Sequence, residues 1–180
     1  MAKKKAAKSA PKVGAGQRIT PFLWFDSQAE EAAEFYASVF SSIWGSKKSK
    51  VQSLVRYGDG GPGPPGTVMV ATFKLEGQEF VALNGGPRFR FTEATSFVIN
   101  CKTQAEVDHF WTKLSRGGEE SMCGWLKDRY GLSWQVVPTA LNEMLSDKNA
   151  VKSKRAMEAM LTMRKIDVNQ IKRAFDGNDR

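Results

Sequence analysis

The sequence has 180 residues, of which 41% are hydrophobic and 11% aromatic, so it suits one domain or two small halves with a packed core. It contains no run of 18 apolar residues and no apolar signal core, which argues against a membrane protein and favours a cytoplasmic one. Cys101 and Cys123 are too few for a disulfide scaffold, and we expect two reduced thiols.

The formal net charge of +8 is concentrated at the N-terminus. Residues 1–18 contain six basic and no acidic side chains, whereas the rest of the chain has 21 basic and 19 acidic ones. This Lys- and Ala-rich segment lacks apolar periodicity, so we expect a disordered tail. We favour a solubilising extension. An arm that binds nucleic acid is the less favoured alternative.

Residues 19–86 carry the pattern of a β-α-β-β-β unit. Residues 19–25 are β-branched and aromatic, as in a strand. Ser27 and Glu30 match a capping box at the start of a helix. Three more strands are expected at residues 50–58, 66–77 and 78–86. The helix should bury a face with i, i+3, i+4, i+7 spacing, formed by Ala32, Phe35, Tyr36 and Val39.

Residues 95–138 repeat this pattern. A strand at 95–101 precedes a second capping box, Thr103 to Glu106, and further short strands end with residues 132–138. The apolar helix positions recur with the same spacing, which indicates an internal duplication. The buried helix face is expected to consist of Val107, Phe110, Trp111 and Leu114.

After Pro138 the pattern becomes helical, with Met, Leu and Ala at helical spacing in residues 139–146, 150–165 and 167–175. We therefore expect a basic tail (1–18), a duplicated βαβββ domain (19–138, with modules 19–86 and 95–138) and a C-terminal helical extension (139–180).

This organisation resembles the vicinal-oxygen-chelate superfamily, which includes glyoxalase I and bleomycin-resistance proteins. The segments "ITPFLWFDSQAEEAAEFYASVF", "ALNGGP" and "GGEESMCGWLKDRYGLSWQVVP" are similar to its PhnB-like group, whose members often carry the label 3-demethylubiquinone-9 3-methyltransferase. The resemblance implies an α+β fold in which two modules form a curled mixed sheet around a ligand, and it implies a homodimer.

The resemblance also implies where a metal would be bound, on the first and last strands of the modules. The matching positions fall within Ile19–Pro21, at Thr95 or Ser96, within Val81–Asn84, and at Gln135. Of these residues, only Gln135 is an ordinary ligand in the superfamily. The single histidine, His109, is predicted on a helix, so we expect no metal.

The methyltransferase label would require a cofactor site. Gly58 to Gly63 match GxGxxG, but a strand pattern follows where a helix N-terminus would be needed. We interpret the segment as a flexible hairpin loop and expect no cofactor.

Asp128 to Gly131 have the preferences of a type I turn, which predicts a final hairpin. Along its second arm, Leu132, Trp134 and Val136 should face the helices, with Ser133, Gln135 and Val137 opposite. Cys123 and Asp128 are the catalytic candidates, although Cys123 would need a nearby base and Asp128 also suits a turn. The ligand-binding candidates are Gln135, Asn84, Ser96 and Trp125.

The sequence thus favours a metal-independent protein that binds a small molecule. An enzyme of the same fold acting on an unknown substrate is the alternative, because fold alone does not define function.

Overall fold

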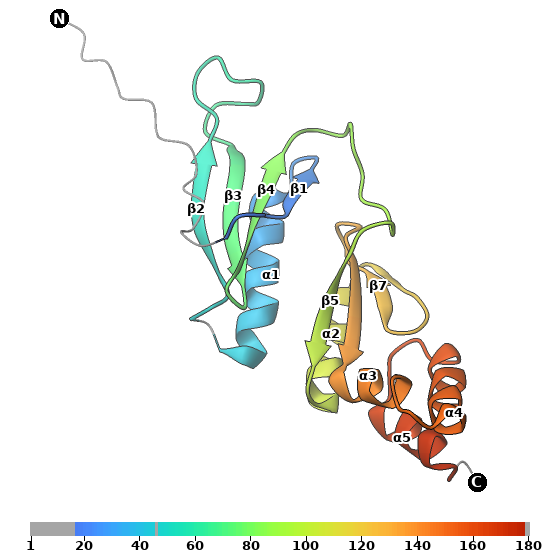
Figure 1. The fold of residues 1–180 in the computed structure, drawn as a ribbon. Helices are drawn as coiled ribbons and strands as arrows, with labels where there is room; N and C mark the ends of the chain where they lie inside the picture. Colours follow the sequence, from blue (N-terminus) through green and yellow to red (C-terminus); the bar gives the residue numbers. More distant parts are fainter. Residues whose placement is uncertain (1–16, 46, 179–180) are drawn as a thin grey trace, which may run out of the picture. The chain divides into compact units, whose positions relative to one another are not determined.

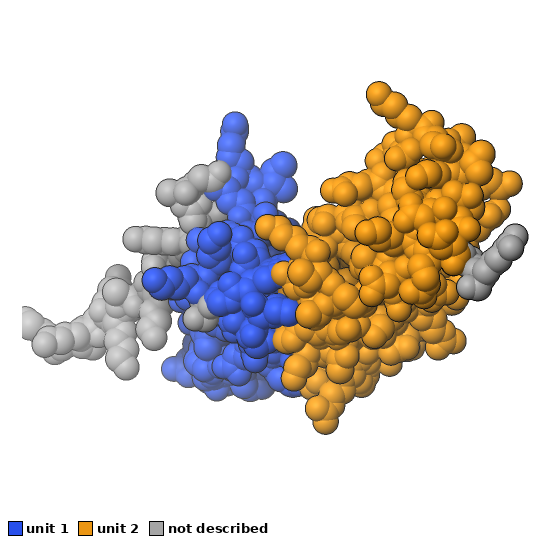
Figure 2. Space-filling view, turned by 90° about the horizontal axis from the view of Figure 1, so that it is seen from below, with its two compact units in different colours: residues 1–90 blue, residues 91–180 orange. Residues whose placement is uncertain are grey.

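The structure is a computed structural model that describes residues 17–45 and 47–178. The chain forms two compact units, which Figure 2 shows in blue and orange. Unit 1 comprises residues 1–90 and unit 2 comprises residues 91–180. The boundary lies between the two predicted modules. The disorder predicted for residues 1–16 lies outside the described residues. The prediction also includes Gln17, but its side chain exchanges two hydrogen bonds of 2.9 Å with the backbone of Glu79.

Unit 1 contains one helix and one four-stranded sheet with the strand order β1-β4-β3-β2 (Figure 1). β1 runs parallel to β4, and the other neighbouring strands are antiparallel. Its elements are β1 (Phe22–Phe25), α1 (Ala29–Trp44), β2 (Lys50–Arg56), β3 (Val68–Leu75) and β4 (Gln78–Asn84).

Helix α1 covers one face of this sheet. Three alanines in its first turns are fully or almost fully buried, which lets the helix approach the strands closely. Tyr36 then stacks on Phe73 at a centroid distance of 6.0 Å, and Phe73 stacks on Phe80 at 5.3 Å. The predicted helix face is buried at Ala32, Tyr36 and Val39 and half-buried at Phe35.

The predicted start of α1 is wrong. The N-cap residue is Gln28, and its side chain makes no capping hydrogen bond. Instead, the amide of Ala29 donates to Oδ1 of Asn84 at 2.7 Å. Asn84 is the last residue of β4 and pairs with Phe25, the last residue of β1, so it reaches the helix start across the sheet. This tertiary contact replaces the local cap.

Unit 2 repeats the topology of unit 1, with the strand order β5-β8-β7-β6 and a parallel pair formed by β5 and β8. This confirms the duplication and the α+β fold class, although the two sheets are not strongly curled (Figure 1). The elements are β5 (Ser96–Cys101), α2 (Gln104–Ser115), β6 (Glu119–Glu120), β7 (Trp125–Lys127) and β8 (Ser133–Pro138).

Helix α2 begins with the predicted capping box. Oγ1 of Thr103 accepts from the amide of Glu106 at 3.2 Å, and the Glu106 carboxylate accepts from the amide of Thr103 at 3.3 Å. The helix face buried against the sheet is the predicted one, namely Val107, Phe110, Trp111 and Leu114.

The final hairpin also forms as predicted, with the amide of Gly131 donating to the carbonyl of Asp128 at 2.9 Å. Trp134 and Val136 are buried under α2. Gln135 and Val137 alternate with them and are half-buried.

Three more helices complete unit 2: α3 (Thr139–Leu145), α4 (Ala150–Leu161) and α5 (Val168–Asp176). They surround a small apolar cluster that includes Leu141, Ala156, Met163, Ile166 and Ile171. Met163 is therefore a core residue, whereas Met157 on α4 is 41% exposed. Within the described ranges, no helix is long and apolar enough to cross a membrane.

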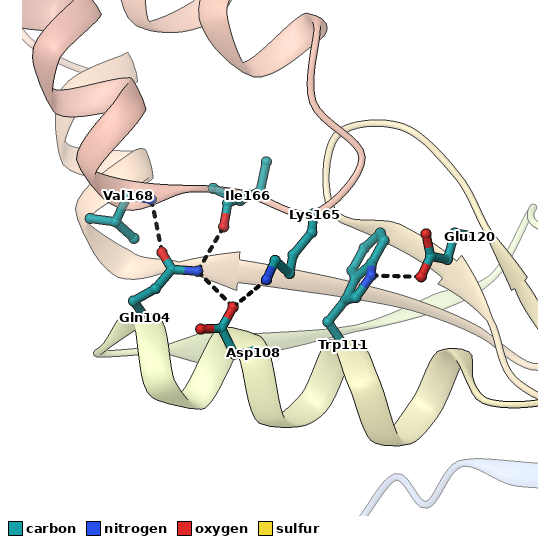
Figure 3. A network of polar contacts seen from close by, with 7 residues as sticks. All are labelled: Gln104, Asp108, Trp111, Glu120, Lys165, Ile166 and Val168. Carbon is teal, nitrogen blue, oxygen red and sulfur yellow. Dashed lines mark hydrogen bonds and ion pairs between the residues drawn. The ribbon is translucent and has the colours of Figure 1, made fainter.

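Gln104, the first residue of α2, joins these helices to the module (Figure 3). Its amide nitrogen donates to the carbonyl of Ile166 at 3.1 Å, and its amide oxygen accepts from the amide of Val168 at 2.9 Å. Asp108, one turn further along α2, pairs with Lys165 at 2.6 Å. The α4–α5 connection is thereby held against α2.

Candidate functional site

Unit 1 contains a pocket of about 600 Å³ at the carboxyl ends of β1 and β4, beside the loop that joins β2 to β3. Its walls are mostly apolar. Residues that shape it include Trp24, Asp26, Tyr57, Pro64, Met69 and Leu83. Asp26 is exposed, and the aromatic side chains are partly buried.

Trp24 is fixed in the pocket wall by the segment that follows β4. Its indole Nε1 donates to the carbonyl of Gly86 at 2.8 Å. The ring lies directly against Gly85, where an added Cβ would come within 2.2 Å of the indole. Phe89 contacts the ring edge-on at a centroid distance of 5.0 Å. Residue 85 must therefore be glycine for Trp24 to keep this position.

Tyr57 forms a second aromatic wall and is held in a similar way. Its hydroxyl donates to the carbonyl of Asn84 at 2.8 Å. Its ring packs on Gly63, where a Cβ would lie 2.4 Å from a ring carbon. The segment predicted to be a hairpin loop is one, because Tyr57 exchanges hydrogen bonds with Thr67 and Gly66 at its base. Strand β3 follows the glycines in the chain, so no helix begins directly after them.

Asn84 lies in the pocket wall, but both ends of its side-chain amide are engaged within the protein. Oδ1 accepts from Ala29, and Nδ2 donates to the carbonyl of Val68 at 2.9 Å. Asn84 therefore links β4, β3 and the start of α1. Its observed contribution is to the shape of the pocket.

The other three predicted ligand-binding residues lie together on the sheet of unit 2. Nε2 of Gln135 donates to Oγ of Ser96 at 2.9 Å. Trp125 is the register partner of Gln135 across β7 and β8, so their side chains share a face of the sheet. On the same face lies Ser133, whose buried hydroxyl has no hydrogen-bond partner among the described residues.

Lys127 is the register partner of Ser133 and carries the charge on this face. Its Nζ lies 2.5 Å from a carboxylate oxygen of Glu93 and 3.9 Å from one of Glu119. The hydrogen bond from Lys127 lowers the pKa of Glu93, and the same bond raises the pKa of Lys127. Both groups thus remain charged at neutral pH.

The two catalytic candidates are held by main-chain groups. The carboxylate of Asp128 is 2% exposed and accepts from the amides of Tyr130 and Leu132 and from the indole of Trp134, at 2.8, 3.1 and 2.8 Å. This is the geometry of a turn residue that also anchors the core.

Cys123 has a positive φ of 60°, and its amide donates to the carbonyl of Met163 at 2.7 Å. Its Sγ lies 3.7 Å from the carbonyl of Met160. Both cysteines are free thiols, as predicted. Burial raises the pKa of the Cys101 thiol to about 12, so that group is not a nucleophile at neutral pH.

The residues expected at metal positions from the resemblance do not fit a divalent ion. Ser96 and Gln135 bond to each other, and Asn84 bonds to backbone groups. His109 lies on α2, as predicted, with its ring against Phe110. Among residues 17–45 and 47–178, no three His, Cys, Asp or Glu side chains are placed to hold a metal ion.

Sequence reasoning missed Trp24, Asp26 and Tyr57. A usable signal was present in Gly85 and Gly63, because a glycine beside a sheet can mark the close approach of a ring. Pairing Gly85 with Trp24, however, requires the register of β1 with β4, and pairing Gly63 with Tyr57 requires the conformation of the loop that contains both.

Comparison with known proteins decides the family. A model of the 3-demethylubiquinone-9 3-methyltransferase family matches residues 17–137. The chain belongs to this family. A Bacillus cereus structure described as a 3-demethylubiquinone-9 3-methyltransferase, PhnB protein, is 40% identical with a TM-score of 0.61, covering 68% of this chain and 100% of its own. The resemblance to the PhnB-like group is thereby confirmed.

Two further solved structures match the chain, and the first of them has a related fold. Pseudomonas aeruginosa PA1353 is 21% identical with a TM-score of 0.55, covering 68% of this chain and 98% of its own. A glyoxalase/bleomycin resistance protein from Albidiferax ferrireducens T118 is 11% identical with a TM-score of 0.42, covering 66% and 95%. The search of curated proteins gave no match.

Proposed function

We propose that this family member binds a small organic molecule in the unit 1 pocket without the help of a metal ion. The observation that carries the proposal is the pocket itself. Its volume of about 600 Å³ lies within the range of small-molecule sites, and its walls are apolar with two aromatic side chains and few polar groups.

The way these walls are held supports the proposal. Trp24 and Tyr57 each donate a hydrogen bond to a backbone carbonyl and each pack on a glycine. Side chains that are already fixed lose little conformational entropy when a ligand binds, so the pocket is pre-organised.

Binding, rather than catalysis, is the activity that we propose. The family name refers to a methyl transfer, but the glycine-rich segment at residues 58–66 is a hairpin loop without the helix N-terminus that a dinucleotide-type site requires. In unit 2, the Cys123 thiol lies 3.7 Å from the carbonyl of Met160, and the Asp128 carboxylate accepts from two backbone amides. The face formed by Ser96, Gln135 and Trp125 stays a predicted second ligand surface.

Native mass spectrometry of the full chain tests the proposal. We expect a ligand to co-purify with the wild-type protein and to be lost from Gly85→Ala, because the added Cβ would displace the Trp24 indole. Gly58→Ala is the matched control, since a Cβ there meets nothing within 4 Å. Circular dichroism should show that both variants fold. A ligand retained by folded Gly85→Ala, or bound nowhere near Trp24, would contradict the proposal.

The predicted homodimer is a separate proposal that light scattering of the purified chain can test. Deleting residues 1–18 and measuring binding to DNA at two salt concentrations would test the alternative role of the basic tail. Both measurements are independent of the pocket.

A further inference from the structure

The charge of the pocket is opposite to that of the chain. Among the described residues that line it, only Asp26 is charged, and it is acidic. The whole chain has a net charge of +8, most of it in residues 1–18, and none of the lysines and arginines that the structure describes lines this pocket. Arg56 lies next to Tyr57 in sequence, but it is paired with Glu30 at 2.9 Å and also donates to the carbonyl of Gly66 at 3.1 Å.

The pocket also has few hydrogen-bond donors to offer to an anion. Asn84 caps the amide of Ala29, so the first amide of helix α1 is already engaged. The Trp24 indole N–H and the Tyr57 hydroxyl both donate to backbone carbonyls. Glu30 in the first turn of α1 is paired with Arg56, so these two charges offset each other near this helix end.

What the walls do offer is two electron-rich rings and a carboxylate at the rim. The faces of Trp and Tyr attract cations, most strongly when the cation is weakly hydrated. The neighbouring aromatic cluster already shows such a contact, because the guanidinium of Arg88 lies 5.3 Å from the ring centre of Phe89, which packs on Trp24. The carboxylate and the aromatic character of the walls therefore favour the same class of ligand.

We propose that the unit 1 pocket selects a small organic cation, an alkylammonium group with an apolar body, which is attracted by Asp26 and packs on Trp24 and Tyr57. This inference rests on the proposed binding function and names the class of ligand that the pocket takes.

Three probes of nearly equal shape and different charge test it: choline, 3,3-dimethylbutan-1-ol and 3,3-dimethylbutanoate. Each is titrated into the full chain while the indole N–H resonance of Trp24 is followed by NMR. That resonance is assigned by its loss in Trp24→Phe. We expect choline to bind at least about fivefold more tightly than the alcohol and the carboxylate to bind most weakly.

Asp26→Asn locates the charge effect. It should weaken choline binding about threefold or more and leave the affinity for the neutral alcohol unchanged. Asp59→Asn is the matched control, because it removes the same charge from an exposed loop position that does not line the pocket. At physiological ionic strength the effect of an exposed charge falls off over about 8 Å, so the charge at position 59 should act more weakly than the one in the pocket wall.

The outcomes separate this inference from the proposed function. If the alcohol or the carboxylate shifts the Trp24 resonance at concentrations as low as choline does, cation selection is overturned and ligand binding stands. If none of the probes shifts it, the cation inference is overturned, and the co-purification experiment decides the binding function independently. Equal effects of Asp26→Asn and Asp59→Asn would also overturn it.

Discussion

The two units share one topology but stabilise their helix starts differently. Helix α2 carries its own cap, because Thr103 and Glu106 satisfy each other's amides within one turn. Helix α1 is capped by Asn84, a residue 55 positions away in sequence. The strand that provides this cap continues into Gly85 and Gly86, which position Trp24. Unit 1 therefore couples the start of its helix to its pocket, and unit 2 does not.

The loop that joins the second and third strands of each unit also differs between the two units. In unit 1 the β2–β3 loop is long, rich in Gly and Pro, and contributes to the pocket. In unit 2 the corresponding connection is short, and Cys123 and Gly124 donate to backbone carbonyls of Met163 and Arg164. Equivalent positions thus form a pocket wall in one unit and a docking site for helices in the other. Duplicated topology does not imply duplicated function.

The largest expected effect is on unit 2. Asp128→Ala would leave two amides and the buried Trp134 indole without their acceptor, which should lower the free energy of unfolding by about 3–5 kcal/mol. Urea unfolding followed by tryptophan fluorescence measures this. Asp59→Ala, at an exposed loop position, is the control and should change it by less than about 0.5 kcal/mol. If Asp128→Ala and Asp59→Ala had equal free energies of unfolding, Asp128 would not anchor the hairpin.

Removing the two caps should lower stability by different amounts and should affect ligand binding differently. Asn84→Ala removes the acceptor for Ala29 and the donor for Val68, and we expect a loss of about 2–3 kcal/mol together with weaker ligand binding in unit 1. Thr103→Ala removes one local cap and should cost about 1 kcal/mol with no effect on binding. Thermal unfolding measures the stability of both variants, and the choline titration measures their ligand binding. If Thr103→Ala impaired binding equally, the contrast between the units would be invalid.

The smallest effect concerns the contact between α2 and the C-terminal helices. The hydrogen bond from Lys165 lowers the pKa of Asp108 below 3.8, so the native state binds fewer protons there than the unfolded chain. The stabilisation is present above pH 3.8 and is lost as the pH falls through the native pKa. Both side chains are more than 40% exposed, so it amounts to less than about 1 kcal/mol.

Urea unfolding of the wild type and of Asp108→Asn between pH 6 and pH 3 measures this contribution. The stability difference between them should shrink as the pH falls. A difference that grew with acidity would reverse the assigned direction of the pKa shift.

The sequence was sufficient for the features that depend on local pattern. The duplication, the α2 capping box and the final hairpin follow from residue spacing and turn preferences, and all are present. The cap predicted at Ser27 failed because a local motif competes with tertiary partners, and here Asn84 bonds the helix start instead. The pocket could not be predicted, since its walls depend on which glycine faces Trp24 and which faces Tyr57.

Gln104 shows how the chain accommodates a segment that lies beyond the part matched by the family model. The family model ends at residue 137, and the helices that Gln104 holds follow that point. A relative that stops after its eighth strand has no backbone at Ile166 or Val168 for this amide to bond. Glutamine would have nothing to bond at this position in such a relative, so we expect it to be replaced freely in members that lack the C-terminal helices.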